Sequence, residues 1–462
     1  MKKGEIYETV IDEVRFPDLG YGTVDGETVV IKNTVPGQKV RFMITKKRNG
    51  NYRGMLLSVL ERSVLETREP LCSNHPDCGG CTFQTMGYEH QKKMKAGSVL
   101  RILAPVFEKA GISRSRLENE LFEGITDAGR EYPYRNKMEY SFGDRTKGGE
   151  LTLGLHRKNS NFDILPCTDC ALVHEDFNRI VNCVQEYCRD HHLDYYHRRT
   201  HEGFLRNLLV RRGEKTGEIL IAVVTSSQSD HSFDDLAEQL LELNLQGRIT
   251  GILHMICDSL SDAVKSEETR VLYGRDHIYD ELLGLRYRIG PFSFFQTNTL
   301  GAEVLYGIVR EYIGDIKDAV VFDLYSGTGT IAQILSASAA KVTGIEIVEE
   351  AVLAARENAK ANDIGNCEFL CGDVFKVLNE IEEHPDFIIL DPPRDGIHPK
   401  AIGNIIDYGA ERIVYVSCKP TSLARDLEIF LENGYEVRKI KCVDMFPETV
   451  HVETVCLLTH KG

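Results

Sequence analysis

The segment Asp323-Leu324-Tyr325-Ser326-Gly327-Thr328-Gly329-Thr330 decides the fold of the C-terminal part of the chain. It follows an apolar run and opens a helix-like stretch, and its glycines allow the backbone to approach a ligand closely. From this segment onward, short β-like runs alternate with helical stretches. The predicted strands are 319–324, 341–345, 367–370, 387–390, 412–416 and 452–458. The alternation predicts a doubly wound, mostly parallel α/β sheet.

Two carboxylates follow the next strands at positions suited to a nucleoside. Glu346 ends the second strand, where it can accept hydrogen bonds from both ribose hydroxyls, and Asp373 follows the third, near an adenine amine. A dinucleotide is the competing ligand, but its loop normally carries a third glycine beside the pyrophosphate. Residues 323–330 lack that glycine. Because S-adenosylmethionine has no phosphates, the shorter loop favours it.

Two other strand ends carry residues suited to chemistry on a nucleobase. Asp391-Pro392-Pro393-Arg394 ends the fourth strand, and an acidic residue before two prolines is typical of enzymes that methylate bases taken out of their stack. Cys418 lies between the fifth strand and a helix expected to begin at Thr421. A helix N-terminus and the neighbouring Lys419 should lower the pKa of this thiol, so Cys418 is a candidate nucleophile. A buried structural cysteine is the alternative interpretation.

A thiolate and a base together explain methylation at carbon 5 of a uracil. That carbon becomes nucleophilic only after a thiolate adds to carbon 6, and a base must then remove the carbon-5 proton. Glu453 starts the last predicted strand and can reach the same sheet edge, although a surface strand residue is the alternative. Cytosine-5 methylation is disfavoured because those enzymes place their cysteine in a Pro-Cys or Thr-Cys motif elsewhere.

Five motifs occur in an order that resembles the RNA uracil-5-methyltransferases. They are residues 293–298, 323–330, 391–394, 417–420 with Arg425-Asp426, and 445–453. The resemblance implies that Cys418 is the nucleophile and Glu453 the base. It implies S-adenosylmethionine contacts from Gln296, Tyr325, Thr330, Glu346, Asp373 and Asp391.

The resemblance also extends beyond the catalytic motifs. It implies that Phe294 stacks near the flipped uracil, that Arg135 meets RNA, and that part of 88–125 packs on the catalytic domain. We expect a strand at 138–142, another at 219–224 and a helix near 88–111.

Residues 5–60 read as about five short strands separated by turn signals, which predicts a small oligonucleotide-binding barrel. This part resembles the TRAM domain that many members of the family carry. One hairpin carries Lys46, Lys47, Arg48 and Arg53, which either meet RNA phosphates or form a solvated turn. The net charge of −15 argues against a protein that coats nucleic acid nonspecifically.

Thirteen cysteines in a chain without a secretory signal indicate thiols, metal ligands or catalysis rather than disulfides. Cys72, Cys78 and Cys81, with Cys167 or Cys170, provide four thiolates, which either zinc or an iron–sulfur cluster accepts. The family's ribosomal-RNA members resemble this spacing and bind a [4Fe–4S] cluster. The resemblance therefore implies Cys72, Cys78, Cys81 and Cys170 as ligands of a [4Fe–4S] cluster. Because this cluster is far from Cys418 in sequence and methyl transfer is not a redox reaction, we expect it to shape an RNA-binding surface.

These predictions give three domains. They are a TRAM-like RNA-binding barrel (1–60), a central mixed α/β domain with the cysteine cluster and an RNA-facing surface (61–285), and a Rossmann-like S-adenosylmethionine-dependent methyltransferase domain (286–462). The chain is 42% hydrophobic and 27% charged, and no apolar run approaches the roughly 18 residues of a membrane span. We expect a cytoplasmic monomer with no obligate protein partner.

The expected activity is formation of 5-methyluridine in RNA, most of all in 23S ribosomal RNA. The barrel and the cysteine cluster favour ribosomal over transfer RNA, because the transfer-RNA branch generally lacks the cluster. A transfer-RNA enzyme is one alternative, and a noncatalytic RNA-binding or folding factor on a retired scaffold is another. The presence of Cys418, Glu453 and Asp391 together argues against a retired site.

Overall fold

The computed structural model describes residues 1–260 and 267–460, which form two compact units. Unit 1 comprises Met1–Pro70, Cys81–Asp127 and Pro392–Gly462, and unit 2 comprises Leu71–Gly80 and Ala128–Asp391. The Asp391-Pro392 bond is therefore a point where the chain passes from one unit to the other. Each unit is described separately below.

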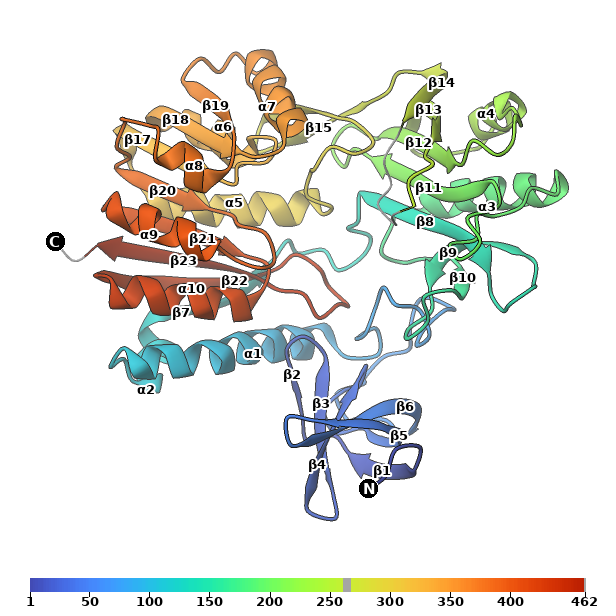
Figure 1. Ribbon diagram of the computed structural model, residues 1–462, viewed down its shortest axis with the longest axis horizontal. Coiled ribbons are helices and arrows are strands. Elements are labelled where there is room, and N and C mark those ends of the chain that lie inside the picture. Colours follow the sequence, from blue (N-terminus) through green and yellow to red (C-terminus); the bar gives the residue numbers. More distant parts are fainter. Residues whose placement is uncertain (261–266, 461–462) are drawn as a thin grey trace. The chain divides into compact units, whose positions relative to one another are not determined.

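The N-terminal part of unit 1 is a curled six-stranded sheet in the order β1-β5-β6-β4-β3-β2 (Figure 1). Its strands are β1 (Ile6–Val10), β2 (Glu13–Arg15), β3 (Leu19–Val24), β4 (Glu27–Lys32), β5 (Lys39–Arg48) and β6 (Asn51–Glu61). Ile11, Val40 and Phe42 are fully buried in its core. The β5–β6 turn uses Asn49 and Gly50, both with positive φ, as a two-residue hairpin requires. The predicted run of short strands and its basic hairpin are confirmed, as a curled sheet of six strands where the sequence predicts a barrel of about five.

The remainder of unit 1 is built around a second sheet, in which β21 and β22 both pair antiparallel with β23 and β7 pairs parallel with β22. Its elements are α1 (Tyr88–Lys109), α2 (Arg114–Arg116), a π-helical turn (Leu117–Leu121), β7 (Phe122–Asp127), α9 (Pro399–Asp407), β21 (Arg412–Ser417), α10 (Pro420–Glu432), β22 (Tyr435–Asp444) and β23 (Glu453–His460). The predicted strands at 412–416 and 452–458 and the helix near 88–111 are confirmed. The sequence did not predict β22, whose polar and apolar residues alternate irregularly across a register shift between Val437 and Lys439.

Helix α1 packs against α10, which confirms that part of 88–125 lies on the catalytic domain (Figure 1). At one end of the contact, Lys109 Nζ lies 2.7 Å from Glu432 Oε1 and also pairs with Glu428. The same helix also contacts the N-terminal sheet, because Arg101 Nη1 lies 3.3 Å from Glu13 Oε2 of β2.

Unit 2 contains the parallel strands that the sequence predicts, in the order β19-β18-β17-β20. The elements are α5 (Thr299–Ile313), β17 (Ile316–Leu324), α6 (Thr330–Ser336), β18 (Ala339–Glu346), α7 (Glu349–Ala361), β19 (Cys367–Cys371), α8 (Val374–Leu378) and β20 (Phe387–Leu390). The carboxyl ends of these strands meet at one edge, which is where a doubly wound sheet binds its ligand.

A second sheet in unit 2 has seven strands in the order β10-β9-β8-β11-β12-β13-β14. The elements are β8 (Lys137–Asp144), β9 (Leu151–His156), β10 (Ile164–Pro166), α3 (Glu175–Asp190), β11 (Leu205–Arg212), β12 (Glu218–Thr225), α4 (Asp234–Leu241), β13 (Arg248–Ile256), β14 (Glu268–Gly274), and the separate hairpin β15 (Ile278–Leu282) and β16 (Leu285–Ile289). The strands predicted at 138–142 and 219–224 are β8 and β12. Across the described residues, no helix is both long and apolar enough to cross a membrane.

Candidate active site

The turn between β17 and α6 is held in a conformation that only glycine adopts easily. Gly327 and Gly329 have φ values of 53° and 69°, and even Tyr325 lies in the left-handed region at 66°. A Cβ on Gly329 would lie 2.4 Å from Cε1 of Phe369, so this position also lacks space for any side chain. The backbone therefore bends tightly at the carboxyl edge of the sheet, just before α6 begins.

Glu346, at the end of β18, accepts hydrogen bonds both from this turn and from the segment that leads into α7. Its Oε2 accepts a hydrogen bond from the Gly327 N–H at 3.0 Å, and its Oε1 accepts one from the Val348 N–H at 2.9 Å. Each carboxylate oxygen has a second lone pair, so Glu346 can still accept a ribose hydroxyl. Asp373 lies exposed at the N-cap of α8, where its Oδ1 accepts a hydrogen bond from Lys376 N–H at 3.3 Å.

A third carboxylate, Asp323, lies beneath the turn and was not predicted as a site residue. It is fully buried, and its Oδ2 accepts a hydrogen bond from the Ala332 N–H at 3.0 Å. Its Oδ1 is buried with no hydrogen-bond partner among the described residues. Burial and the nearby Asp391 raise the pKa of Asp323 to about 8, and burial raises the pKa of Asp391 to about 7. A bound cation would relieve this crowding of acidic groups.

The segment before α5 brings Phe294 and Gln296 to the glycine turn. Thr328 Oγ1 donates to the Phe294 carbonyl at 3.2 Å, and the Phe294 side chain stays 63% exposed. The Gln296 side chain hydrogen-bonds to Tyr306, while its carbonyl accepts from Asn136 Nδ2 at 2.9 Å. An exposed aromatic ring beside a cofactor turn suits stacking on a nucleobase.

Unit 2 thus gathers Gln296, Tyr325, Thr330, Glu346, Asp373 and Asp391 at or near one sheet edge.

Cys418 lies in unit 1 directly after β21 and two residues before α10. The helix begins at Pro420, one residue earlier than predicted, because proline is well suited to the first helical position. Cys418 is half-buried. The Nζ of the neighbouring Lys419 lies 3.7 Å from the exposed Asp395 carboxylate. This ion pair partly offsets the positive charge of Lys419.

Glu453 starts β23 at the same end of the sheet as Cys418. In the antiparallel pairing of β21 with β23, Ser417 lies opposite Thr454. Cys418 is the residue directly after this pair on the β21 side, and Glu453 is the residue directly before Thr454 on β23. Glu453 is 7% exposed. The predicted nucleophile and base therefore both lie at the same end of the β21–β23 strand pair.

The Arg425-Asp426 motif holds the loop that follows the two prolines. Asp426 Oδ2 accepts hydrogen bonds from the Ile397 N–H at 2.8 Å and the Tyr415 hydroxyl at 2.7 Å, and Arg425 donates to the Asp395 carbonyl at 2.8 Å. A Cβ on Gly396 would lie 2.5 Å from both side chains of this motif. These residues position the loop and do not belong to the reacting groups.

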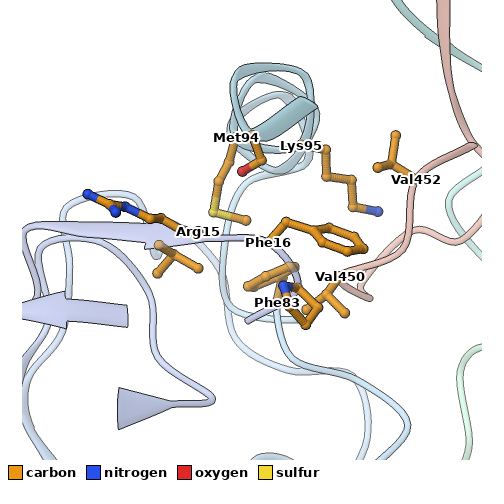
Figure 2. A pocket seen from close by; sticks show the side chains of 10 residues that line it. Arg15, Phe16, Phe83, Met94, Lys95, Val450 and Val452 are labelled. Carbon is orange, nitrogen blue, oxygen red and sulfur yellow. The ribbon is translucent and has the colours of Figure 1, made fainter. Parts of the chain in front are cut away.

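A buried polar network holds the connection from β22 to β23, which ends at Glu453. Glu448 is fully buried and accepts hydrogen bonds from Arg68 and from Gln91 Nε2 at 2.9 Å. Lys95 of α1 donates to Asp444 Oδ1 at 2.7 Å and to the Phe446 carbonyl at 3.0 Å. Figure 2 shows Lys95 beside Val450 and Val452, just ahead of Glu453, around a pocket that Phe16 and Phe83 also line. Phe446 and Glu448 belong to the motif at 445–453, but no residue of this network was predicted to have a role in the site.

Four of the five candidate cluster cysteines belong to unit 2, whereas Cys81 belongs to unit 1. Cys78 and Cys170 carry Sγ atoms that accept backbone hydrogen bonds, from Gly80 and from Leu172 and Val173, as thiolate ligands commonly do. A hydrogen bond with Cys167 lowers the pKa of Cys170 to about 7, and burial raises that of Cys72 to about 11. Among residues 1–260 and 267–460, however, no three His, Cys, Asp or Glu side chains are arranged to hold a metal ion.

Comparison with known proteins shows the family of this chain. The sequence model of the tRNA (Uracil-5-)-methyltransferase family matches residues 215–461. An uncharacterized RNA methyltransferase of Clostridium tetani is 47% identical over 461 residues, covering 100% of this chain and 99% of that protein. Another from Caldanaerobacter subterraneus subsp. tengcongensis is 45% identical over 458 residues, covering 99% of each.

Among solved structures, the fold is similar to the Pyrococcus abyssi tRNA (uracil-54, C5)-methyltransferase in complex with S-adenosyl-L-homocysteine. The TM-score is 0.76 at 24% identity, and the match covers 98% of this chain and 100% of that one. The site and fold define an RNA methyltransferase. The chain belongs to the tRNA (uracil-5-)-methyltransferase family and is an S-adenosylmethionine-dependent RNA (uracil-5-)-methyltransferase.

Proposed function

We propose that this enzyme makes 5-methyluridine in 23S ribosomal RNA through a covalent adduct between Cys418 and carbon 6 of the target uracil. The observation that supports the mechanism is that Cys418 directly follows β21 and Glu453 begins β23, so both residues lie at the same end of this antiparallel strand pair. A nucleophile and a base that act on adjacent carbons of one ring must lie within a few ångströms of each other.

The proposed reaction proceeds in three steps. The Cys418 thiolate forms a bond to carbon 6, and the electron pair of the 5,6 double bond moves toward carbon 5 and O4. Carbon 5 then attacks the methyl group that S-adenosylmethionine supplies as a sulfonium, and the cleaved bond leaves its electrons on that sulfur. Glu453 finally accepts the proton from carbon 5, the double bond re-forms, and the Cys418 sulfur departs as thiolate.

The proposed cofactor residues have complementary chemistry. Glu346 and Asp373 offer oxygens to ribose and adenine donors, and Tyr325 and Thr330 belong to the tight turn and the start of α6. Gln296 and Asp391 complete the set at the same edge. The acidic groups around Asp323 and Asp391 favour a cationic ligand such as a sulfonium over a dinucleotide, whose phosphates they would repel.

The preference for ribosomal RNA rests on the N-terminal barrel and the cysteines. The barrel presents Lys46 and Arg48 as exposed cations on the β5–β6 hairpin, a feature suited to RNA phosphates. We propose that Cys72, Cys78, Cys81 and Cys170 hold a [4Fe–4S] cluster that shapes the RNA-binding surface. The backbone N–H groups directed at Cys78 and Cys170 support thiolates at these positions.

The cluster is tested by anaerobic purification followed by iron and sulfide analysis. The proposal expects about four irons and four sulfides per chain. Replacing Cys170 by Ser should remove the iron, whereas the same change at Cys183 should retain it. One zinc and no sulfide, or iron loss from Cys167→Ser but not from Cys170→Ser, would overturn this ligand assignment.

Transfer RNA is the second candidate substrate, because the similar Pyrococcus abyssi structure is of a tRNA (uracil-54, C5)-methyltransferase. Unmodified 23S and transfer RNA transcripts should be incubated separately with labelled S-adenosylmethionine and digested to nucleosides for mass spectrometry. Label in 5-methyluridine from 23S RNA is the expected result. Label from transfer RNA alone would preserve the chemistry and overturn the proposed substrate.

A further inference from the structure

A cavity of about 210 Å³ in unit 2 is lined by a cluster of basic side chains that the reaction does not use. The lining residues are Arg130, Pro133, Tyr134, Arg135, Asn136, His174, Arg212 and Glu214. The segment between β7 and β8, the start of α3 and the end of β11 converge here. The volume corresponds to roughly seven water molecules, which is sufficient for a phosphate group and part of its sugar.

The charge of this cavity is positive. Three arginines line it against a single carboxylate, that of Glu214, which lies 2.7 Å from Arg130 Nη2. Asp176 accepts hydrogen bonds from the Gln246 and Gly247 N–H groups and lies 3.4 Å from Arg212 Nε. Arg130 and Arg212 thus each lie near a carboxylate, and Arg135 gives the site an excess of one positive charge, which favours an anionic ligand.

Donors remain available in the cavity. In the part of the chain that the structure describes, the Nε atoms of Arg130 and Arg135 are buried and have no hydrogen-bond partner. Leaving a charged donor without a partner costs free energy, so native proteins normally satisfy such atoms with water or a ligand. The side chains of Arg130, His174 and Arg212 are 31%, 21% and 15% exposed, and therefore the lining can be reached from solvent.

The cavity is directly connected to the methyl-donor side of the site. Asn136, in its wall, donates from Nδ2 to the Gln296 carbonyl and to Thr299 Oγ1, both at 2.9 Å. The Asn136 N–H donates to the Thr297 carbonyl at 2.8 Å. Asn136 thus contacts both the cavity and the backbone segment that carries Gln296 and Phe294.

We propose that this cavity binds one backbone phosphate of the substrate RNA, close to the target uridine, through Arg130, Arg135 and Arg212. This inference rests on the RNA methyltransferase activity and adds a specific contact to it. Arginine suits the role because its planar fork donates two parallel hydrogen bonds to phosphate oxygens. Such a contact fixes the register of the strand without reading its sequence, as backbone contacts do in nucleic-acid recognition.

The test measures binding of the RNA that the full-length enzyme methylates, as a function of salt concentration. Arg130→Gln and Arg135→Gln should each weaken binding by about tenfold and make the slope of log K against log salt shallower by about one. Arg270→Gln is the matched control, because Arg270 lies on the edge strand β14 and pairs with Glu268 at the surface. Affinity for S-adenosylhomocysteine and the thermal midpoint should be unchanged in all three variants.

A second measurement identifies the phosphate. Single uncharged methylphosphonate linkages are placed one at a time around the target uridine. One linkage should weaken binding to the parent enzyme by about tenfold yet add little to the loss already caused by Arg135→Gln. Unchanged affinity and salt slope in both cavity variants, or fully additive losses at every linkage, would overturn the proposal.

Other outcomes separate this proposal from the choice of substrate. If transfer RNA is methylated instead of 23S RNA, the same measurements on transfer RNA still test the cavity. If inorganic phosphate binds the parent enzyme and not the variants, while RNA affinity stays the same in all, the cavity is a free-anion site and its assignment to RNA is wrong.

Discussion

Lys95 and Asp444 form a buried ion pair, with Lys95 Nζ 2.7 Å from Asp444 Oδ1 and side-chain exposures of 2% and 0%. The pair joins α1 to the end of β22, and the same ammonium holds the Phe446 carbonyl in the loop that ends at Glu453. Burial lowers the pKa of Lys95, whereas Asp444 opposes that shift. The pair therefore links a helix distant in sequence to the loop that precedes Glu453, the proposed base.

Replacing Lys95 by Met should destabilise unit 1 by about 3–5 kcal/mol, because Asp444 would be left as an unpaired buried charge. Chemical denaturation measures the loss. The double variant Lys95→Met with Asp444→Leu should recover most of it, since neither charge then remains. Lys109→Met is the control, because its ion pairs with Glu428 and Glu432 are exposed and should contribute little. A single variant as stable as the parent would contradict this role for the pair.

The acidic pair at the cofactor edge predicts how stability depends on pH. The pKa values of Asp323 and Asp391 are raised to about 8 and about 7, above the ordinary value near 4 of an unfolded chain. Between pH values of about 4 and 8, the folded state therefore binds more protons than the unfolded state. Its stability should therefore fall as pH rises from about 4 to 8.

Asp391→Asn tests this pH dependence. The variant should show a flatter dependence of the thermal midpoint across pH 5 to 8 and should be more stable than the parent at pH 8. In the parent enzyme, saturating S-adenosylmethionine should also make the thermal midpoint depend less steeply on pH, because the cationic sulfonium stabilises the ionised carboxylates. A parent enzyme whose thermal midpoint rises steadily over this range would show that both groups ionise normally.

Gly329→Ala should impair both folding and cofactor binding. The position has a φ of 69°, which costs a side-chain-bearing residue about 1–2 kcal/mol, and the new Cβ would meet Phe369 at 2.4 Å. Gly307→Ala in α5 is the matched control, because nothing lies within 4 Å of its Cβ position and alanine favours helices. Calorimetry with S-adenosylhomocysteine should show lost affinity for the first variant only. Equal affinity of the two variants for S-adenosylhomocysteine would mean that the turn at residue 329 accommodates a side chain.

Sequence reasoning found the residues that lie at strand ends. Cys418, Glu346 and Asp391 each follow an apolar strand, and the carboxyl edge of a parallel sheet is a known place for ligands. Their positions were therefore predictable from local pattern and resemblance. Glu453 was found in the same way, but the antiparallel pairing of β21 with β23, which brings Glu453 to the same end of the sheet as Cys418, required the structure.

The residues that sequence reasoning missed act through long-range contacts. Gln91 and Glu448 are separated by 357 positions, and neither lies in a pattern that signals burial with a partner. Asp323 was read as part of a strand and its turn, because only the packed structure shows that its carboxylate is fully buried. Likewise, Arg130 and Arg212 share a cavity although no spacing in the sequence relates them.

The most direct test of the central claim is trapping of the covalent adduct. Glu453→Gln should form the Cys418–uracil bond and transfer the methyl group, yet release the product slowly because no carboxylate accepts the carbon-5 proton. With substrate RNA and S-adenosylmethionine, this variant should give a protein–RNA species that survives a denaturing gel. The double variant with Cys418→Ala should give none. Turnover of Glu453→Gln at the parent rate without an adduct, or an adduct that persists without Cys418, would contradict the account.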